Sequence, residues 1–142
     1  MNSIRDELVA LDTNEFVFAL RREARRTACE DLFLKGLPAL RIYVPLQILV
    51  ELQHNLSQDE MRDALIGLTR ARSVTWDYAP AQPEIVERWQ QRGAKKGDAM
   101  IVAHLEADGI RYLISENRHF LAELSNLPFT VLTSEQVLSL LD

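Results

Sequence analysis

The chain has 142 residues, of which 47% are hydrophobic and 26% are charged, so it can bury one sizeable core. We therefore expect one folded domain over residues 1–142 rather than a disordered chain. The net charge of −5 argues against a protein that grips nucleic acid by bulk electrostatics, because such proteins are usually basic. This charge does not exclude an acidic site that reaches phosphates through bound cations.

The composition also argues against a membrane or secreted protein. No apolar run approaches the roughly 18 residues of a membrane span. Residues 1–7 have no cationic stretch leading into an apolar one, so we expect no signal peptide and a cytoplasmic protein. The single cysteine, Cys29, cannot form an internal disulfide, and its place in a helical pattern favours a small buried thiol.

The chain begins with a predicted strand and a predicted helix. Residues 7–11 form a short apolar stretch that favours a strand, and a helical pattern follows directly. One face of this helix is predicted to be apolar and another to be basic. The apolar face carries Phe16, Val17 and Leu20, and the basic one carries Arg21, Arg22, Arg25 and Arg26.

The next segments predict a second strand and two helices. Residues 41–44 are rich in β-branched and aromatic side chains, which favours a strand. Pro45 then stands where a helix favours its first residue, and an apolar helix is predicted to residue 52. Residues 57–60, Ser-Gln-Asp-Glu, fit a capping box that opens a helix to about Arg70.

The second half of the chain continues the alternation of strands and helices. Residues 73–76 predict a short strand at an edge of the sheet, and residues 112–114 and 129–132 predict two more, with a short helix between them. Helices are predicted over residues 83–91, closed by Gly93, and over residues 98–107, ended by Asp108 and Gly109. Residues 133–136 are expected to cap a final helix.

This alternation implies a parallel sheet with helices on both faces. In open sheets of this kind, ligands bind beyond the carboxyl ends of the strands, near the switch in strand order. The residues that follow each strand are therefore the first candidates for a functional site.

Asp12 follows the first predicted strand immediately. Residues 12–15, Asp-Thr-Asn-Glu, resemble a capping box, so Asp12 is either a helix cap or a ligand. Thr13 and Asn14 add oxygen atoms at the same corner, which suits a hard cation and suits a cap equally well.

Glu51 lies in a predicted helix whose other residues are nearly all apolar. A carboxylate on a buried helix is costly unless it is paired or binds a metal. Gln47, Glu51 and His54 share one stripe of this helix, so a surface glutamate is the alternative. Because the stripe starts near the end of the second strand, Glu51 is able to face the same crevice as Asp12.

Two further corners complete the pattern. Asp98 opens a helix that is apolar almost all round, and it is either a cap or a ligand at the mouth of a central helix. Residues 115–120, Ser-Glu-Asn-Arg-His-Phe, follow a strand directly and are either a plain turn or a fourth polar corner.

Taken together, these corners place an oxygen ligand at the end of successive strands. Carboxylates held a few ångströms apart must raise their pKa values or recruit cations. Oxygen-only ligation favours Mg²⁺ or Mn²⁺ over zinc. Such a centre hydrolyses phosphodiester bonds by activating a water molecule and stabilising the leaving oxygen.

The same pieces resemble the PIN-domain family, specifically the VapC-type toxins of bacterial and archaeal toxin–antitoxin pairs. The similarity is carried by residues 11–14 (Leu-Asp-Thr-Asn), Glu51, residues 97–103 (Gly-Asp-Ala-Met-Ile-Val-Ala) and residues 113–120. The resemblance implies an α/β/α sandwich and a Mg²⁺- or Mn²⁺-dependent endoribonuclease acting on RNA. It further implies a homodimer that a small cognate antitoxin inhibits.

By position, the resemblance assigns Asp12, Glu51 and Asp98 as metal ligands and Asn117 as the fourth catalytic position. The family usually has Asp at that fourth position, so the neutral amide puts a second metal in doubt. The neighbouring Glu116 is a candidate to compensate. Residues expected to support the site from a second layer are Thr13, Asn14, Glu116 and His54.

Basic residues near this site are candidates for RNA contact. Lys95 and Lys96 stand just before Asp98 and could meet phosphates. Arg21 and Arg25, with the neighbouring arginines, could steer RNA or form a solvated helix face.

Two other interpretations remain open at this stage. The chain could be a non-catalytic PIN-like domain that binds RNA or a protein, which Asn117 favours. It could also be a nucleotide-binding or response-regulator-like α/β domain with Asp12 and Asp98 as helix caps. The last interpretation requires the acids to lie apart in space.

Overall fold

A computed structural model describes residues 3–142, and a five-stranded parallel sheet forms its centre. The strand order is β3-β2-β1-β4-β5, and every neighbouring pair is parallel. Met1 and Asn2, the start of the segment expected to lack a signal peptide, lie outside the described residues. The strands are β1 (Leu8–Leu11), β2 (Arg41–Pro45), β3 (Ser73–Asp77), β4 (Tyr112–Ile114) and β5 (Thr130–Leu132).

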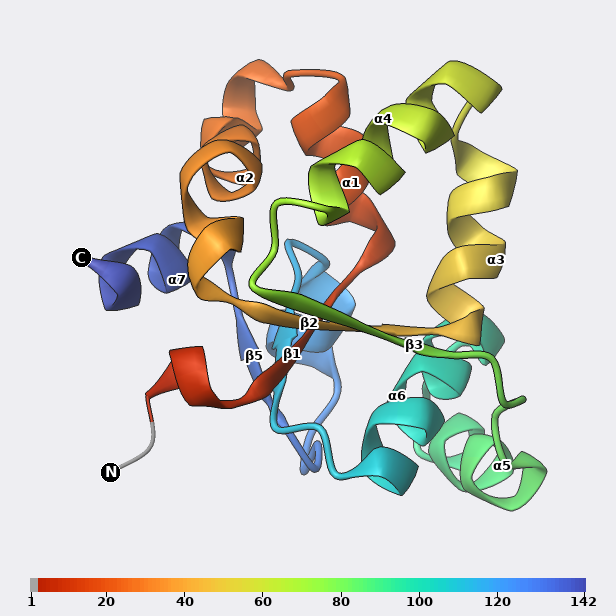
Figure 1. Cartoon of the computed structure of the whole chain (residues 1–142). Coiled ribbons are helices and arrows are strands. Elements are labelled where there is room, and N and C mark those ends of the chain that lie inside the picture. The colour runs from red at the N-terminus through yellow and green to blue at the C-terminus, as the bar shows by residue number, and fades with distance from the viewer. Residues whose placement is uncertain (1–2) are drawn as a thin grey trace.

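Helices cover both faces of the sheet, which confirms the predicted three-layer α/β/α architecture. Figure 1 shows α1, α2 and α4 on one face and α5 and α6 on the other, while α3 rises from the carboxyl end of β2. The α-helices are α1 (Thr13–Leu20), α2 (Thr27–Asp31), α3 (Leu46–Asn55), α4 (Gln58–Leu68), α5 (Pro83–Gln91), α6 (Lys96–Asp108) and α7 (Ser134–Leu141). Shorter helical turns are η1 (Ile4–Asp6), η2 (Ala24–Arg26), η3 (Leu32–Gly36), η4 (Leu37–Ala39) and η5 (His119–Glu123).

The strand order reverses at β1, the central strand. The chain builds outward from β1 through β2 to β3, then returns to the other side of β1 to form β4 and β5. The carboxyl ends of β1 and β4 therefore lie side by side, with Leu11 paired to Ile114. This is the switch point at which open parallel sheets bind their ligands.

Several predicted helix ends are confirmed. Ser57 and Thr133 each form a complete capping box, at the start of α4 and of α7. Gly109 ends α6 in a left-handed conformation with φ of 65°, which glycine adopts without steric cost. Other boundaries differ from the prediction. Pro45 ends β2 and stands at the N-cap of α3, α3 continues to Asn55, and α6 begins at Lys96, before Asp98.

The first helix is shorter than predicted. It ends at Leu20 because the backbone turns at Arg22, which has a φ of 49°. The prediction that the four arginines form one face of this helix is therefore wrong. Arg25 and Arg26 lie in the separate turn η2, where the guanidinium of Arg26 stacks 5.6 Å from the ring centre of Phe18.

The core is continuous across the sheet. Val9 and Ala10 of β1 are completely buried, and α6 buries its residues 101–105, as expected for a helix at the centre of a domain. Cys29 is also completely buried, as predicted. No helix within residues 3–142 is long and apolar enough to cross a bilayer.

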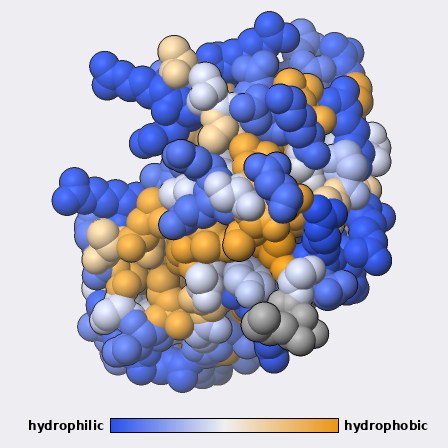
Figure 2. Space-filling view, turned by 90° about the vertical axis from the view of Figure 1, so that its left-hand side faces the viewer, coloured by the Kyte–Doolittle hydropathy of each residue, from blue (hydrophilic) through white to orange (hydrophobic). Residues whose placement is uncertain are grey.

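Part of the apolar surface remains outside this core. Figure 2 shows a patch of hydrophobic residues, surrounded by hydrophilic ones, on the face of the molecule that lies at the left of Figure 1. Exposed large hydrophobic side chains among the described residues include Leu34, Ile66 and Leu140. Exposed apolar patches of this kind are often sites of protein interaction.

We expect Ile101→Ala in α6 to lower the free energy of unfolding by about 2–5 kcal/mol, since the side chain is completely buried. Urea denaturation followed by circular dichroism measures this change. Leu140→Ala on α7 is the control, because that side chain is 58% exposed and its truncation should cost far less. Equal losses in the two variants would contradict the central position of α6.

Candidate functional site

One open pocket of about 300 Å³ gathers side chains from segments far apart in the chain. It lies at the carboxyl ends of β1 and β4, beside α3 and the first turn of α6. All four polar corners predicted from the sequence meet here. The interpretation as a nucleotide-binding or response-regulator-like domain required the acids to lie apart in space, so it is excluded. The lining residues are Asp12, Thr13, Asn14, Val17, Glu51, Asn55, Asp98 and Asn117.

Asp12 is both a helix cap and part of this pocket. One carboxylate oxygen, Oδ1, accepts a 2.8 Å hydrogen bond from the backbone N–H of Thr13, and Oδ2 accepts one of 2.6 Å from the hydroxyl of Ser115. Burial, reinforced by the nearby charges of Glu51 and Asp98, raises the pKa of Asp12 to about 6. The predicted capping box is absent, because Glu15 is turned into the core instead.

Glu51 is held at both of its oxygens by neutral donors. The hydroxyl of Thr13 donates to Oε1 at 2.7 Å, and the amide of Gln47 donates to Oε2 at 2.9 Å. The backbone of α6 passes so close that a Cβ added to Gly97 would lie 3.3 Å from Oε2. Both oxygens of the carboxylate are thus fixed in position.

Asp98 is the least restrained of the three acids. It lies in the first turn of α6, whose N-cap is Lys95, so Asp98 is not the cap that the alternative interpretation required. Burial raises the pKa of Asp98, whereas the electrostatic effect of the nearby His119 lowers it. The nearest partner is the Nε2 atom of His119, 3.6 Å from Oδ2, which is beyond hydrogen-bond distance.

Hydrogen bonds in the turn after β4 connect Asn117, the fourth corner, to Asp12, the first. The hydroxyl of Ser115, which donates to Asp12, also accepts a 2.9 Å hydrogen bond from the backbone N–H of Asn117. The side-chain oxygen of Asn117 accepts a 3.0 Å bond from the backbone of His119. Ser115 is completely buried, and it was not among the predicted site residues.

The supporting residues expected from the sequence divide into two groups. Thr13 and Asn14 line the pocket, and Asn14 accepts a 3.4 Å bond from the backbone N–H of Glu116. The structure does not bring His54 into the pocket, since it is exposed near the end of α3. The carboxylate of Glu116 points elsewhere, toward Ser134 and Glu15, so it does not compensate for the neutral Asn117.

The predicted RNA contacts also divide. Lys95 and Lys96 are exposed at the start of α6, beside Asp98. Arg21 forms a 2.9 Å ion pair with Glu60 and donates a hydrogen bond to the backbone oxygen of Asn55. Arg25 lines a different cavity, which shares no residue with the acidic pocket.

Within the described part of the chain, basic side chains offset the charge of the pocket only at Asp98, where His119 and Lys95 lower the pKa of the carboxyl group. Among residues 3–142, no lysine or arginine forms an ion pair with Asp12, Glu51 or Asp98. The three carboxylates and the amide carbonyl of Asn117 all offer oxygen atoms as ligands, and the open pocket leaves room for water. This donor set fits a small hard cation such as Mg²⁺ or Mn²⁺.

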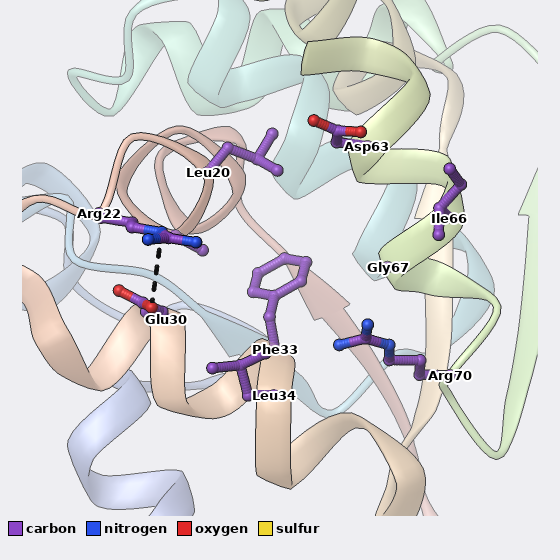
Figure 3. A pocket seen from close by; sticks show the side chains of 10 residues that line it. Leu20, Arg22, Glu30, Phe33, Leu34, Asp63, Ile66, Gly67 and Arg70 are labelled. Carbon is purple, nitrogen blue, oxygen red and sulfur yellow. Dashed lines mark ion pairs between the residues drawn. The ribbon is translucent and has the colours of Figure 1, made fainter. Parts of the chain in front are cut away.

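A second cavity of about 280 Å³ lies between α1, η3 and α4 and has a different character (Figure 3). Phe33 stands at its centre, with Leu34 and Ile66 nearby. An ion pair between Arg22 and Glu30, with 3.8 Å between the charged atoms, closes one side. No residue of this cavity lines the acidic pocket, so the two are separate features.

The fold and the acidic pocket together define a sheet-edge carboxylate site of the kind found in PIN domains. The family model for the PIN domain matches residues 9–125, which include all four corners of the pocket. The chain therefore belongs to the PIN domain family.

Solved structures support the same fold. The chain matches a chain in the crystal structure of VapBC2 from Rickettsia felis bound to a DNA fragment from their promoter. The match has 20% identity and a TM-score of 0.57, and it covers 87% of this chain and 98% of the other. VapC20 of Mycobacterium tuberculosis, a sarcin–ricin loop cleaving toxin, matches at 17% identity and a TM-score of 0.55, covering 81% and 94%. No curated protein sequence matches the chain.

We expect Asp12→Asn to stabilise the metal-free protein at high pH. Because the pKa of Asp12 is raised from 3.8 to about 6 in the folded state, ionisation of this group costs stability as the pH rises through that interval. The gain in the free energy of unfolding should reach about 3 kcal/mol at pH 8 and fall to about half that at pH 5.

Urea unfolding in EDTA at the two pH values measures this difference. Asp59→Asn is the matched control, since the side chain of Asp59 is 85% exposed and lies outside the pocket. A variant that is less stable than the wild type at pH 8 would show that the Asp12 cap outweighs its burial.

Proposed function

We propose that this protein is a Mg²⁺- or Mn²⁺-dependent endoribonuclease that hydrolyses RNA phosphodiester bonds. The observation that carries the proposal is the convergence of Asp12, Glu51 and Asp98 on one open pocket without a lysine or arginine paired to them. Membership of the PIN domain family supports nuclease chemistry at this position.

In this proposal Asp12, Glu51 and Asp98 hold the cation. When bound, the cation lowers the pKa of an attacking water molecule and neutralises charge on the scissile phosphate. Thr13 and Gln47 keep the carboxylate of Glu51 in place, and Ser115 does the same for Asp12. Such outer hydrogen bonds orient ligands and support metal affinity.

Asn117 completes the site as a neutral fourth corner. Its amide oxygen already accepts a hydrogen bond from the backbone of His119. An amide also binds a cation more weakly than a carboxylate does, which favours one metal ion in this pocket over two. In this proposal Lys95 and Lys96, which are exposed at the start of α6, contact phosphates of the RNA.

We further propose that the protein is the toxin of a toxin–antitoxin pair, cytoplasmic and homodimeric. The likeness to VapC20, named as a sarcin–ricin loop cleaving toxin, and to VapBC2 supports this role. Exposed apolar side chains, among them Leu34 and Ile66, are consistent with a protein partner such as an antitoxin.

A second candidate is a non-catalytic PIN-like domain that binds RNA or a protein. The neutral Asn117 at the fourth corner is the observation that favours it. Calorimetric titration with Mn²⁺ separates the two, because the nuclease must bind the ion. An absence of Mn²⁺ binding at millimolar concentration would point to the non-catalytic domain.

Asp98→Asn and Asp12→Asn should each abolish RNA cleavage, because each removes one of three charges that hold the cation. Cleavage of a labelled RNA in Mn²⁺ is the measurement, and EDTA should stop the wild-type reaction. Asp59→Asn on α4, outside the pocket, should cleave at the wild-type rate. Full activity in both pocket variants, with contaminating nuclease excluded, would falsify the proposed function.

Gln47→Ala should weaken Mn²⁺ binding by about tenfold, since it removes the donor that fixes Oε2 of Glu51. The dissociation constant from calorimetry is the readout, with thermal unfolding to confirm that the fold is intact. Gln53→Ala serves as the control, because Gln53 is exposed on the same helix and outside the pocket. An unchanged dissociation constant for Gln47→Ala would mean that Thr13 alone positions Glu51.

A further inference from the structure

A second group of ligating side chains lies on the other side of the turn after β4. One ligand atom each from Glu15 of α1, Cys29 of α2 and Glu116 lies within 4.8 Å of the other two. Glu15 and Cys29 have no exposed surface, and Glu116 is half-buried. None of these three residues lines the acidic pocket, so this cluster is a separate feature.

The cluster contains more acceptors than donors. Ser134 supplies two donors: its hydroxyl donates to Oε2 of Glu15, and its backbone N–H donates to Glu116 at 3.0 Å. Oε1 of Glu15 is fully buried and has no hydrogen-bond donor among residues 3–142. A buried acceptor without a donor costs about 1–3 kcal/mol, so this atom calls for a proton or a cation.

No basic side chain balances the two carboxylates. Among the ion pairs of the described residues, none involves Glu15 or Glu116. Burial, together with the adjacent Glu116, raises the pKa of Glu15, and burial together with Glu15 raises the pKa of Cys29. Without a cation, the cluster therefore keeps protons on the Glu15 carboxyl and on the Cys29 thiol.

We propose that Glu15, Cys29 and Glu116 form a second metal site, which takes a thiophilic divalent cation such as Zn²⁺. The sulfur of Cys29 decides the class of metal, since thiolate ligands select Zn²⁺ over Mg²⁺. A tetrahedral zinc ion with bonds of about 2.0–2.3 Å holds its ligand atoms roughly 3.3–3.8 Å apart, so small side-chain rotations bring the three atoms into place.

One side of the cluster borders a cavity. Cys29 and Glu116 line a cavity of about 390 Å³, which gives an ion a path inward and leaves water for the fourth position. Binding would displace two protons, one from the carboxyl of Glu15 and one from the thiol of Cys29. The bound ion would then join α1 and α2 to the turn at residues 115–117.

Titration of the full chain with Co²⁺ tests this site, because a cobalt–thiolate bond gives a near-ultraviolet charge-transfer band that oxygen ligands do not give. Excess Mg²⁺ is added to compete with Co²⁺ for the acidic pocket, on the basis of the proposed function. We expect the band to saturate at one ion per chain, with release of about two protons for each ion bound. The chain has only one cysteine, so the band reports Cys29 alone.

Two variants make the result specific. Glu15→Gln removes one ligand and should weaken Co²⁺ binding by at least tenfold. Asp98→Asn, which alters only the acidic pocket, should keep the wild-type band, so failure of this site and failure of the proposed nuclease are distinguishable. No band in the wild type at millimolar Co²⁺, or equal binding by Glu15→Gln, would overturn the proposal and leave the two carboxyl groups sharing a proton.

Discussion

The crowding of Asp12, Glu51 and Asp98 in a partly buried pocket is the constraint on which the rest of this site depends. Burial raises the pKa values of Asp12 and Asp98, and repulsion from the neighbouring acids adds a smaller part. The fold brings these acids together and leaves them without a paired lysine or arginine. They are held instead by neutral groups, the hydroxyls of Thr13 and Ser115 among them, which restrain the oxygens without cancelling their charge. The pocket therefore costs stability when it is empty and ionised, and a divalent cation relieves that cost. The crowding of the acids thus accounts both for the lower stability of the empty pocket and for its affinity for a divalent cation.

The parallel sheet makes this crowding possible. Neighbouring parallel strands present their carboxyl ends at one edge, and the reversal of strand order at β1 separates the helices that follow, leaving a crevice. The register that pairs Leu11 with Ile114 sets the next residues, Asp12 and Ser115, within hydrogen-bond distance of each other. Because α6 runs back toward the opposite edge, its first turn carries Asp98 to the same crevice. The acids of separate segments thus form one site only because the order of the strands brings them together.

That dependence explains what the sequence could and could not predict. The period of apolar residues and the capping signals located the strands and most helices. The strand-end rule found Asp12, Glu51 and Asp98 and the corner at residues 115–120, and the resemblance to PIN domains then singled out Asn117. Ser115 was missed because its bond to Asp12 depends on the register between β1 and β4, which no local pattern encodes. The arginine face failed because nothing near Leu20 marks a helix end: the turn is made by Arg22, a residue that seldom adopts a positive φ.

The direction of the Glu116 side chain was likewise not predictable from the sequence. The turn that contains Glu116 lies between two clusters of acids with different ligand atoms. In the turn after β4, Ser115 and Asn117 are directed to the acidic pocket, while Glu116 between them turns toward Glu15 and Ser134. The acidic pocket is open and offers oxygen ligands, which suits a hard cation that keeps its water. The Glu15 cluster is buried and includes a thiol, which suits a softer cation with few waters. Two neighbouring groups of acids therefore need not compete for the same ion, because burial and one sulfur atom distinguish them.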